Sequence, residues 1–245
     1  MLWLGHATVR ITTPGGKVLV IDPWLGGNPK TPAAFKPLAS LGKVDLILVT
    51  HAHPDHFTDA PALGQLNKAK MVVPSDFGYT LLALGMVPED GMIRLHKGAT
   101  VMPFGDGGLK ITGVHAEHSS QMRMKNPTTG KDEVWPGGEP MGYIIELENG
   151  FKIWHTGDTA VFGDMQLIGR TYRPDLVMAS IDGAFTMNPV DAALAMTEMV
   201  KPKYVMPIHF GTLPIMRGTA ADFKAALGRS PVQMLVIDPG QKVEF

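Results

Sequence analysis

Four candidate metal ligands stand within six residues, directly after an apolar run, Val44–Val49, that is typical of a buried strand. The segment after the run comprises Thr50, His51, Ala52, His53, Pro54, Asp55 and His56. Ligands commonly bind at the carboxyl ends of strands in α/β sheets. In extended backbone His51 and His53 point to the same side, and Pro54 then turns the chain. Because imidazole and carboxylate suit zinc and similar metals, we expect a metal site here rather than a polar loop with chance histidines.

Short apolar runs punctuated by glycine predict many strands. We expect them at Thr8–Thr12, Lys17–Ile21, Val44–Thr50, Lys70–Val73, Leu109–His115, Gly142–Glu148, Phe151–Thr156, Leu176–Ser180, Tyr204–Pro207 and Gln233–Ile237. The pair Asn149-Gly150 predicts a hairpin turn in which both residues tolerate positive φ. Helices are predicted at Asp59–Leu66, Asp76–Leu84, Pro189–Val200 and Thr219–Leu227. This order fits two packed sheets covered by helices, although other layered α/β folds share it.

The composition limits the classes to which the chain can belong. The 245 residues contain no linker or compositional break, which predicts one domain over residues 1–245. The formal net charge is −1, so nucleic acid is not an expected partner. Cysteine is absent, which excludes disulfides, thiolate zinc sites and a cysteine nucleophile. Without an apolar run of membrane-spanning length or a signal-peptide pattern, we expect a cytoplasmic protein with no membrane partner.

Three further candidate ligands follow predicted strands elsewhere in the chain. They are His118 in Glu-His-Ser-Ser, Asp158 in His-Thr-Gly-Asp-Thr and His209 in Pro-Ile-His-Phe-Gly. Taken singly, each has an ordinary explanation, since a histidine at a strand end is often a surface residue and an aspartate can cap a helix. A zinc site nevertheless needs ligands from more than one segment.

The motifs HAHPDH, EHSS, HTGDT and PIHFG, in this order, resemble the metallo-β-lactamase superfamily of dinuclear metal hydrolases. The segments LGHATVRI, GYIIELENGFKIWHTGDT, GDMQLIG, FTMNP and VMPIHFGT are similar to one widely distributed group of metal-dependent hydrolases. That group is similar to the ascorbate-phosphate lactonase and N-acyl phospholipid phosphodiesterase branches. The resemblance extends from Leu2 to about Leu227. It implies an α/β (α+β) fold, a four-layer αββα sandwich of two mixed β-sheets flanked by helices, with the site at one edge between the sheets.

The resemblance also implies a complete ligand set. One metal would be held by His51, His53 and His118, the other by Asp55, His56 and His209, and both by the bridging Asp158. Related di-iron proteins tend to carry a carboxylate at the position of His53. We expect two divalent metal ions, zinc first, with manganese or iron as alternatives. A hydroxide that bridges the metals would attack the substrate, and Asp55 would orient it.

Other histidines and acids lie close to these motifs. His6 is a candidate catalytic residue that touches substrate or donates a proton, with a buried structural histidine as an equal alternative. Asp182 stands where the related group often has glycine, and an ordinary turn residue is favoured over a partner of a ligand histidine or of the substrate. Residues expected to support a ligand or to lie on the surface, rather than to bind metal, are Asp22, His96, His115 and His155.

The stretch Gln121–Pro140 is expected to be a long loop that borders the site, because it begins just after His118. Arg123 and Lys125 are candidate partners for an anionic group of the substrate, and Trp135 for an apolar or planar part. A solvated loop is the alternative for each of them. Residues that are either further apolar walls or core are Phe185, Met187 and Phe210.

These features favour a metal-dependent hydrolase whose substrate is a small, anionic ester, lactone or phosphodiester. The alternatives are a nuclease-like phosphodiesterase and a non-catalytic, metal-stabilised binding protein. The net charge disfavours the nuclease, and the complete ligand set disfavours the binding protein. A homo-oligomer is suggested by the resemblance alone, and the fold does not name the scissile bond.

Overall fold

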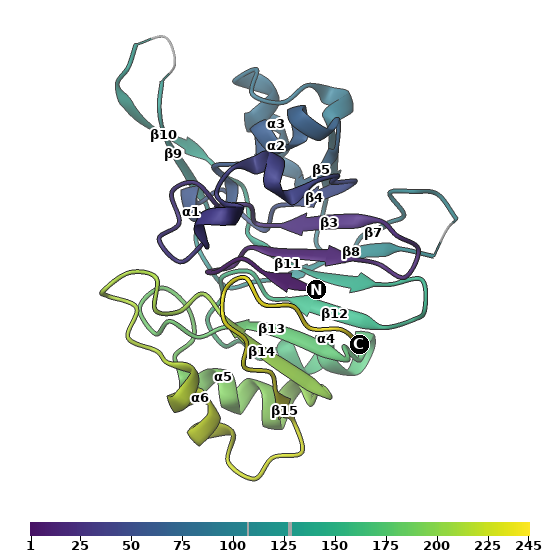
Figure 1. The fold of residues 1–245 in the computed structure, drawn as a ribbon, viewed down its shortest axis with the longest axis vertical. Coiled ribbons are helices and arrows are strands. Elements are labelled where there is room, and N and C mark those ends of the chain that lie inside the picture. The colour runs from purple at the N-terminus through teal and green to yellow at the C-terminus, as the bar shows by residue number, and fades with distance from the viewer. Residues whose placement is uncertain (107, 127–128) are drawn as a thin grey trace.

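The apolar runs form two mixed sheets that lie against each other (Figure 1). The computed structural model describes residues 1–106, 108–126 and 129–245. The first sheet contains, in spatial order, β1 (Leu2–Trp3), β2 (Val9–Thr12), β3 (Val18–Ile21), β4 (Leu46–Leu48), β5 (Lys70–Pro74) and β6 (Met92–Leu95). Strands β1 to β3 are antiparallel, and β3 to β6 are parallel.

The second sheet has the spatial order β15-β14-β13-β12-β11-β8-β7. Its strands are β7 (Thr100–Val101), β8 (Lys110–His115), β11 (Met141–Glu146), β12 (Lys152–His155), β13 (Leu176–Ser180), β14 (Tyr204–Ile208) and β15 (Gln233–Met234). Strands β12 to β15 are parallel, whereas β7, β8, β11 and β12 pair antiparallel. All ten predicted strands are confirmed. The additional strands β1, β6 and β7 have at most four residues, too few for a clear alternation of apolar and polar side chains.

The helices connect the strands and cover the outer faces of the sheets. The α-helices are α1 (Pro54–Phe57), α2 (Ala60–Asn67), α3 (Ser75–Ala83), α4 (Met165–Tyr172), α5 (Pro189–Leu194) and α6 (Ala220–Leu227). Helix α5 continues as a π-helix over Ala195–Val200, and short 3-10 helices span Ala33–Phe35, Leu38–Leu41 and Glu89–Gly91. The four predicted helices are confirmed, with α1 and α4 in addition. No helix in the described part of the chain has the length and apolarity needed to cross a bilayer.

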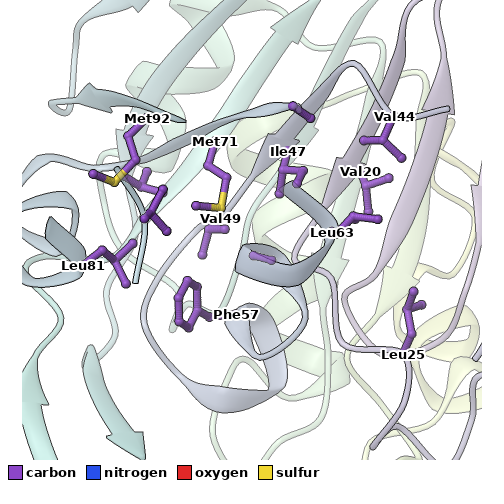
Figure 2. Packing of buried hydrophobic residues seen from close by; sticks show 14 of the residues in the cluster. Val20, Leu25, Val44, Ile47, Val49, Phe57, Leu63, Met71, Leu81 and Met92 are labelled. Carbon is purple, nitrogen blue, oxygen red and sulfur yellow. The ribbon is translucent and has the colours of Figure 1, made fainter. Parts of the chain in front are cut away.

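Three apolar clusters fill the spaces between four layers. Leu48 and Tyr143 belong to the cluster between the two sheets. Figure 2 shows the cluster on the outer face of the first sheet, where Ile47 and Leu63 lie between β4 and α2. Trp154 belongs to the third cluster, which packs the second sheet against α4, α5 and α6. Burial of such a large apolar side chain contributes about 1.5–3 kcal/mol. The expected αββα sandwich of two mixed sheets is confirmed.

The predicted hairpin between β11 and β12 is confirmed, but its turn has three residues. The amide of Leu147 donates to the carbonyl of Phe151 over 2.9 Å, which closes the loop. Gly150 alone has positive φ, at 82°, and Asn149 instead accepts a hydrogen bond from the Phe151 amide. The third loop residue is therefore the one that needs glycine.

Two paired strands, which together form a hairpin, occupy much of the stretch 121–140, which the sequence predicts to be a long loop. Strands β9 (Gln121–Lys125) and β10 (Asp132–Pro136) pair antiparallel, and the hairpin projects from the body of the molecule (Figure 1). Residues 127 and 128 of this stretch lie outside the described part of the chain. The signal for the first strand is the alternation Gln-Met-Arg-Met-Lys, which places both methionines on one face.

The strand directions bring the candidate residues together. Strands β1, β3 and β4 share one direction in the first sheet, and β8, β12, β13 and β14 share one direction in the second. The segments that follow these strands carry His6, Asp22, His51, His53, Asp55, His56, His118, Asp158, Asp182 and His209. Because the carboxyl ends of such strands meet at one edge, the fold gathers these residues in one place.

Candidate metal centre

The seven predicted ligands converge at this edge in two adjacent groups, the second of which also contains His6. The first group is His51, His53, His118 and Asp158, and the second is His6, Asp55, His56 and His209. Within each group, one donor atom of every residue lies within 4.8 Å of the others. Imidazole and carboxylate donors at such separations could hold zinc or a related metal.

Asp158 lies between the two groups. Its Oδ2 is 3.1 Å from Nε2 of His209 and 3.3 Å from Nε2 of His56 in the second group. The same oxygen is 3.6 Å from Nε2 of His118 and 3.9 Å from Nε2 of His51 in the first group. One buried carboxylate therefore contacts imidazoles on both sides, as a bridging ligand would.

Three buried atoms of the cluster that could coordinate a metal lack a hydrogen bond within the described residues: His56 Nε2, His209 Nε2 and Asp158 Oδ1. Both imidazoles lie close to Oδ2 of Asp158, but without hydrogen-bond geometry. A buried polar atom without a partner costs about 1–3 kcal/mol. A metal ion accepts electron pairs from all three atoms, so the residues present fit a bound metal.

Asp22 orients two of the imidazoles from outside the cluster. Its Oδ2 accepts from Nδ1 of His56 over 2.8 Å and from the hydroxyl of Thr50 over 2.8 Å. Because that hydroxyl donates to Asp22, it accepts from Nδ1 of His51, which lies 3.0 Å away. A proton held at Nδ1 leaves Nε2 of each ring as the atom that can coordinate. The supporting role predicted for Asp22 matches this geometry.

Asp182 orients a third imidazole and also shapes a loop. Its Oδ2 accepts from Nδ1 of His209 over 2.9 Å and from the Thr186 hydroxyl over 2.6 Å. Its Oδ1 accepts from the amides of Ala184 and Phe185, each over 2.7 Å. The sequence favours an ordinary turn residue at this position. In the structure, the same carboxylate closes the turn and holds a candidate ligand.

Burial and charge move the pKa values of these histidines in opposite directions. Burial lowers the pKa of His51, with a further contribution from the neighbouring His56. Burial also acts to lower the pKa of His56, but nearby carboxylates, Asp158 first, raise it to about 10. Asp158 likewise raises the pKa of His209 above its usual range against the effect of burial. In the protein without metal, these carboxylates therefore favour the charged form of His56 and His209, so a metal that binds there competes with protons.

Backbone strain is concentrated at the same edge. His6, Asp22 and His209 have left-handed backbone, with φ of 55°, 46° and 55°. The other non-glycine residues with positive φ in the described chain, each directly after a helix, are Lys68, Arg173 and Lys201. That conformation is common at helix ends, but elsewhere it costs about 1–3 kcal/mol and persists only where surrounding contacts enforce it.

His6 contacts the cluster from behind. Its side chain has no exposed surface, and burial together with His209 lowers the pKa of His6 to about 4, so the ring is neutral at pH 7. Nε2 lies 2.9 Å from Oδ2 of Asp55, and Nδ1 lies 2.9 Å from the Thr212 hydroxyl. Because a carboxylate only accepts, Nε2 carries the proton, and Thr212 donates to Nδ1. Between the two roles that the sequence leaves open, this geometry favours positioning of Asp55 over contact with substrate.

A cleft of about 1040 Å³ opens over the cluster. We call the side of the cleft that carries candidate metal ligands, with His53, Asp55 and His118, the floor. The hairpin wall comprises Gln121, Arg123, Met124, Lys125, Asp132, Glu133 and Val134. The loop wall comprises Trp24, Ala184, Phe185, Leu213 and Met216. The stretch that follows His118 therefore does border the site, as the sequence predicts.

The two predicted cations of the hairpin wall differ in their partners. Lys125 lies 3.0 Å from Asp132 in an exposed ion pair. Arg123 has neither a hydrogen bond nor an ion pair with any residue in the described chain, and its exposed side chain lines the cleft. Arg123 is thus the better placed of the two to bind an anionic group.

Trp135 does not line the cleft, contrary to the prediction. It lies opposite Met122 in the hairpin, and both side chains pack against the outer core of the first sheet. Side chains alternate between the faces of a strand, so Arg123 and Val134 occupy the other face, toward the cleft. The expected loop would have left Trp135 free to face the site, whereas the strand does not.

The sequence leaves Phe185, Met187 and Phe210 as either walls of the site or core residues, and the structure distinguishes them. Phe185 lines the cleft. Met187 is buried in the cluster under α5. Phe210 stacks on Trp3 with the ring centroids 5.8 Å apart, at the margin of the core.

The remaining histidines lie outside the two metal-binding groups of the described chain. His155 is buried, where Nε2 donates to the Ala7 carbonyl and Nδ1 accepts from the Gly157 amide. It thereby fixes the loop that carries Asp158. His115 is half-buried at the end of β8, and His96 is exposed.

Sequence reasoning missed several residues at or next to the cleft, among them Trp24, Leu213 and Thr212. Trp24 lines it and meets the His6 ring edge-on, with the centroids 5.0 Å apart. Leu213 lines it as well, and Thr212 holds His6. Their signal is proximity, since each stands within four residues of Asp22 or His209.

Comparisons with known proteins agree with this picture. A family model described as the beta-lactamase superfamily domain matches residues 17–210. A UPF0173 metal-dependent hydrolase of Cupriavidus necator is 58% identical over 100% of this chain and 85% of its own length. A UPF0173 metal-dependent hydrolase of Rubrobacter xylanophilus is 40% identical over 98% of this chain and 94% of its own length.

Solved structures give the same fold. The metallo hydrolase Igni18 from Ignicoccus hospitalis superimposes with a TM-score of 0.84 and 29% identity, over 100% of this chain and 97% of that chain. An isothiocyanate hydrolase from Delia radicum gut bacteria superimposes with a TM-score of 0.72 and 19% identity, over 100% of this chain and 98% of that chain. The second likeness concerns the fold alone.

Proposed function

The chain belongs to the metallo-β-lactamase superfamily and is a metal-dependent hydrolase, and we propose that it uses two divalent metal ions to hydrolyse a small anionic ester, lactone or phosphodiester. The observation that carries the proposal is the set of buried donor atoms without hydrogen bonds in the described chain, on His56, His209 and Asp158. The proposal takes residues 1–245 as one domain and zinc as the first metal to test, with manganese and iron next.

In this proposal His51, His53 and His118 hold one ion, Asp55, His56 and His209 hold the other, and Asp158 contacts both. When bound, such a pair of ions activates water as a nucleophile and withdraws charge from the oxygen that becomes negative in the reaction. The imidazoles are held by Asp22, Thr50 and Asp182, so the side chains need little reorganisation when metal binds.

Asp55 has a second role in the proposal. Burial acts to raise the pKa of Asp55, but His56, His209 and His6 hold it below the usual range, so the carboxylate is ionised. Its Oδ2 accepts from Nε2 of His6. Besides holding metal, the carboxylate could accept a hydrogen bond from the attacking water and orient it.

The position of Arg123 in the cleft is the observation that supports an anionic substrate. Its guanidinium can bind a carboxylate or phosphate through two parallel hydrogen bonds. The same wall carries Lys125 paired with Asp132, together with the acid Glu133, so its cationic charge does not exceed its acidic charge. This balance fits a single small anion better than the repeated phosphates of a nucleic acid. The cytoplasmic location and a homo-oligomeric state stay predictions from the sequence.

The proposal is tested by elemental analysis of protein purified without chelator or a metal-binding tag. We expect about two equivalents of a first-row metal per chain. Chelation should abolish hydrolysis of screened lactones, esters and phosphodiesters while the far-ultraviolet circular dichroism stays unchanged, and the same metal should restore the rate. A chain that contains no metal and takes none up would overturn the proposal.

A further inference from the structure

The loop wall exposes large apolar side chains inside the cleft. Phe185 is 49% exposed and Leu213 is 41% exposed, and both line the cleft beside Trp24. Val134, at 64% exposure, lines it from the hairpin wall, in register with Arg123. Apolar groups gathered around one cleft commonly mark a surface that a ligand covers.

The loop wall is fixed by hydrogen bonds that also fix residues of the two candidate metal-binding groups. The Phe185 amide donates to Oδ1 of Asp182, whose Oδ2 holds a candidate ligand histidine. Leu213 directly follows Thr212, whose hydroxyl donates to Nδ1 of His6. Any displacement of either apolar side chain through its backbone would therefore disturb the metal-binding groups. Such coupling is expected of a wall that positions a ligand over the floor.

We propose that the substrate is amphiphilic: an acyl chain or an aromatic ring lies against Phe185 and Leu213, and an anionic group binds Arg123. The inference rests on the proposed function, because the bond to be cleaved must lie at the floor, between the two recognition elements. The cleft has room for both, since about 1040 Å³ is at the upper end of the volumes of small-ligand pockets, about 300–1,000 Å³.

A second copy of the chain is the other occupant that could cover apolar side chains. Phe185 and Leu213 share the cleft with His53 and His118 of the floor. A subunit seated on them would close the cleft and block access to the floor. The continuity of the wall with the floor therefore favours the substrate.

The test uses straight-chain carboxylates as probes, so that it does not depend on knowing the scissile bond. Acetate, butanoate, hexanoate and octanoate are titrated into the metal-loaded protein, and Kd is measured by calorimetry. We expect Kd to fall about twofold to fourfold for each methylene that the wall covers. The double variant Phe185→Ser, Leu213→Ser should bind acetate as before and lose most of this gain. Leu167→Ser, at an exposed leucine of α4, is the matched control and should keep it.

Equal Kd values for acetate and octanoate would overturn the inference, as would a gain that survives the double variant. A change in oligomeric state in the double variant, measured by light scattering, would assign the wall to a second copy instead. Metal content separates this inference from the proposed function. If the protein holds metal but Kd does not depend on chain length, only the apolar recognition by the loop wall is overturned. If Kd depends on chain length but the protein holds no metal, only the proposed metal-dependent hydrolysis is overturned.

Discussion

The floor and the hairpin wall border the same cleft but are built in opposite ways. Directly beneath the floor, His56, His209 and Asp158 are buried, and the two imidazoles are held from behind by Asp22 and Asp182. On the hairpin wall, the side chains that face the cleft are largely exposed. A buried network tolerates few substitutions because each residue depends on its partners, whereas an exposed strand face can change without disturbing the fold. In the proposed function, the floor and the residues beneath it would set the chemistry, and the wall could adapt to the substrate.

The strongest test of this contrast is Asp158→Ala. Because Asp158 contacts imidazoles of both groups, we expect the variant to retain at most one metal ion per chain and to lose nearly all turnover, at least about a hundredfold. Metal content is measured by elemental analysis and turnover with the best substrate from the screen. The matched control is Asp90→Ala, at an exposed residue far from the cluster in the chain. Full metal content and a normal rate in Asp158→Ala would remove the residue from the bridge.

Asp182→Asn tests whether the hydrogen bond from His209 to Asp182 contributes to metal affinity. The amide oxygen can still accept from the turn amides, but the amide nitrogen cannot accept the proton of His209 Nδ1. We expect metal affinity to weaken about tenfold to a hundredfold, with full stoichiometry at excess metal.

Thr186→Val is the control for this variant, because it removes the other hydrogen bond to Oδ2 of Asp182 and leaves His209 held. Its metal affinity should stay within about threefold of the parent, a difference of about 0.7 kcal/mol. Equal affinity in Asp182→Asn and the parent protein would show that the carboxylate serves the turn alone.

Thr212→Val acts on Asp55 of the floor indirectly, through His6. Without the hydroxyl, Nδ1 of His6 loses its donor, and the ring is no longer fixed with its proton toward Asp55. A buried acceptor left without a partner costs about 1–3 kcal/mol, so we expect kcat to fall about tenfold while both metals stay. Thr212→Ser keeps the hydroxyl and should restore the rate. A rate loss of the same size in Thr212→Ser would point to packing instead.

That the candidate ligands lie together could be predicted from the sequence, because they form short local motifs at strand ends. The pairing of Asp182 with His209, 27 residues away, and of Thr212 with His6, 206 residues away, could not. These contacts depend on which segments the two sheets bring to the common edge, and no single segment contains that information.

The prediction of a loop at the hairpin wall was wrong for a different reason. Alternation over residues 121–125 is a usable signal, but a stretch with five prolines and glycines from 127 to 138 is more typical of a loop. The wrong prediction of a loop also led to the wrong position for Trp135, because only a strand fixes the face on which its side chain lies. Arg123 lines the cleft all the same, since a residue close to His118 borders it in either conformation.

On the wall, Arg123→Ala should act on binding rather than on chemistry. We expect KM for anionic substrates to rise about tenfold, with kcat and metal content unchanged, because a charge-assisted hydrogen bond contributes about 1.5–3 kcal/mol when water is excluded and less when exposed. Lys125→Ala is the control, because Lys125 is already paired with Asp132. An equal rise in KM for neutral substrates would defeat the anion-binding role.

The smallest effect is expected on the other face of the same hairpin. Trp135→Phe keeps an aromatic ring against the core and removes a buried indole N–H that has no hydrogen bond within the described chain. Loss of packing and relief of the unpaired donor oppose each other, so the free energy of unfolding should change by no more than about 1 kcal/mol. KM should not change, since the ring faces the core and Arg123 the cleft. Denaturant unfolding measures the first quantity and steady-state kinetics the second. A rise in KM with unchanged stability would mean that the two faces of the hairpin are coupled, and that the wall is less independent of the core than its exposure suggests.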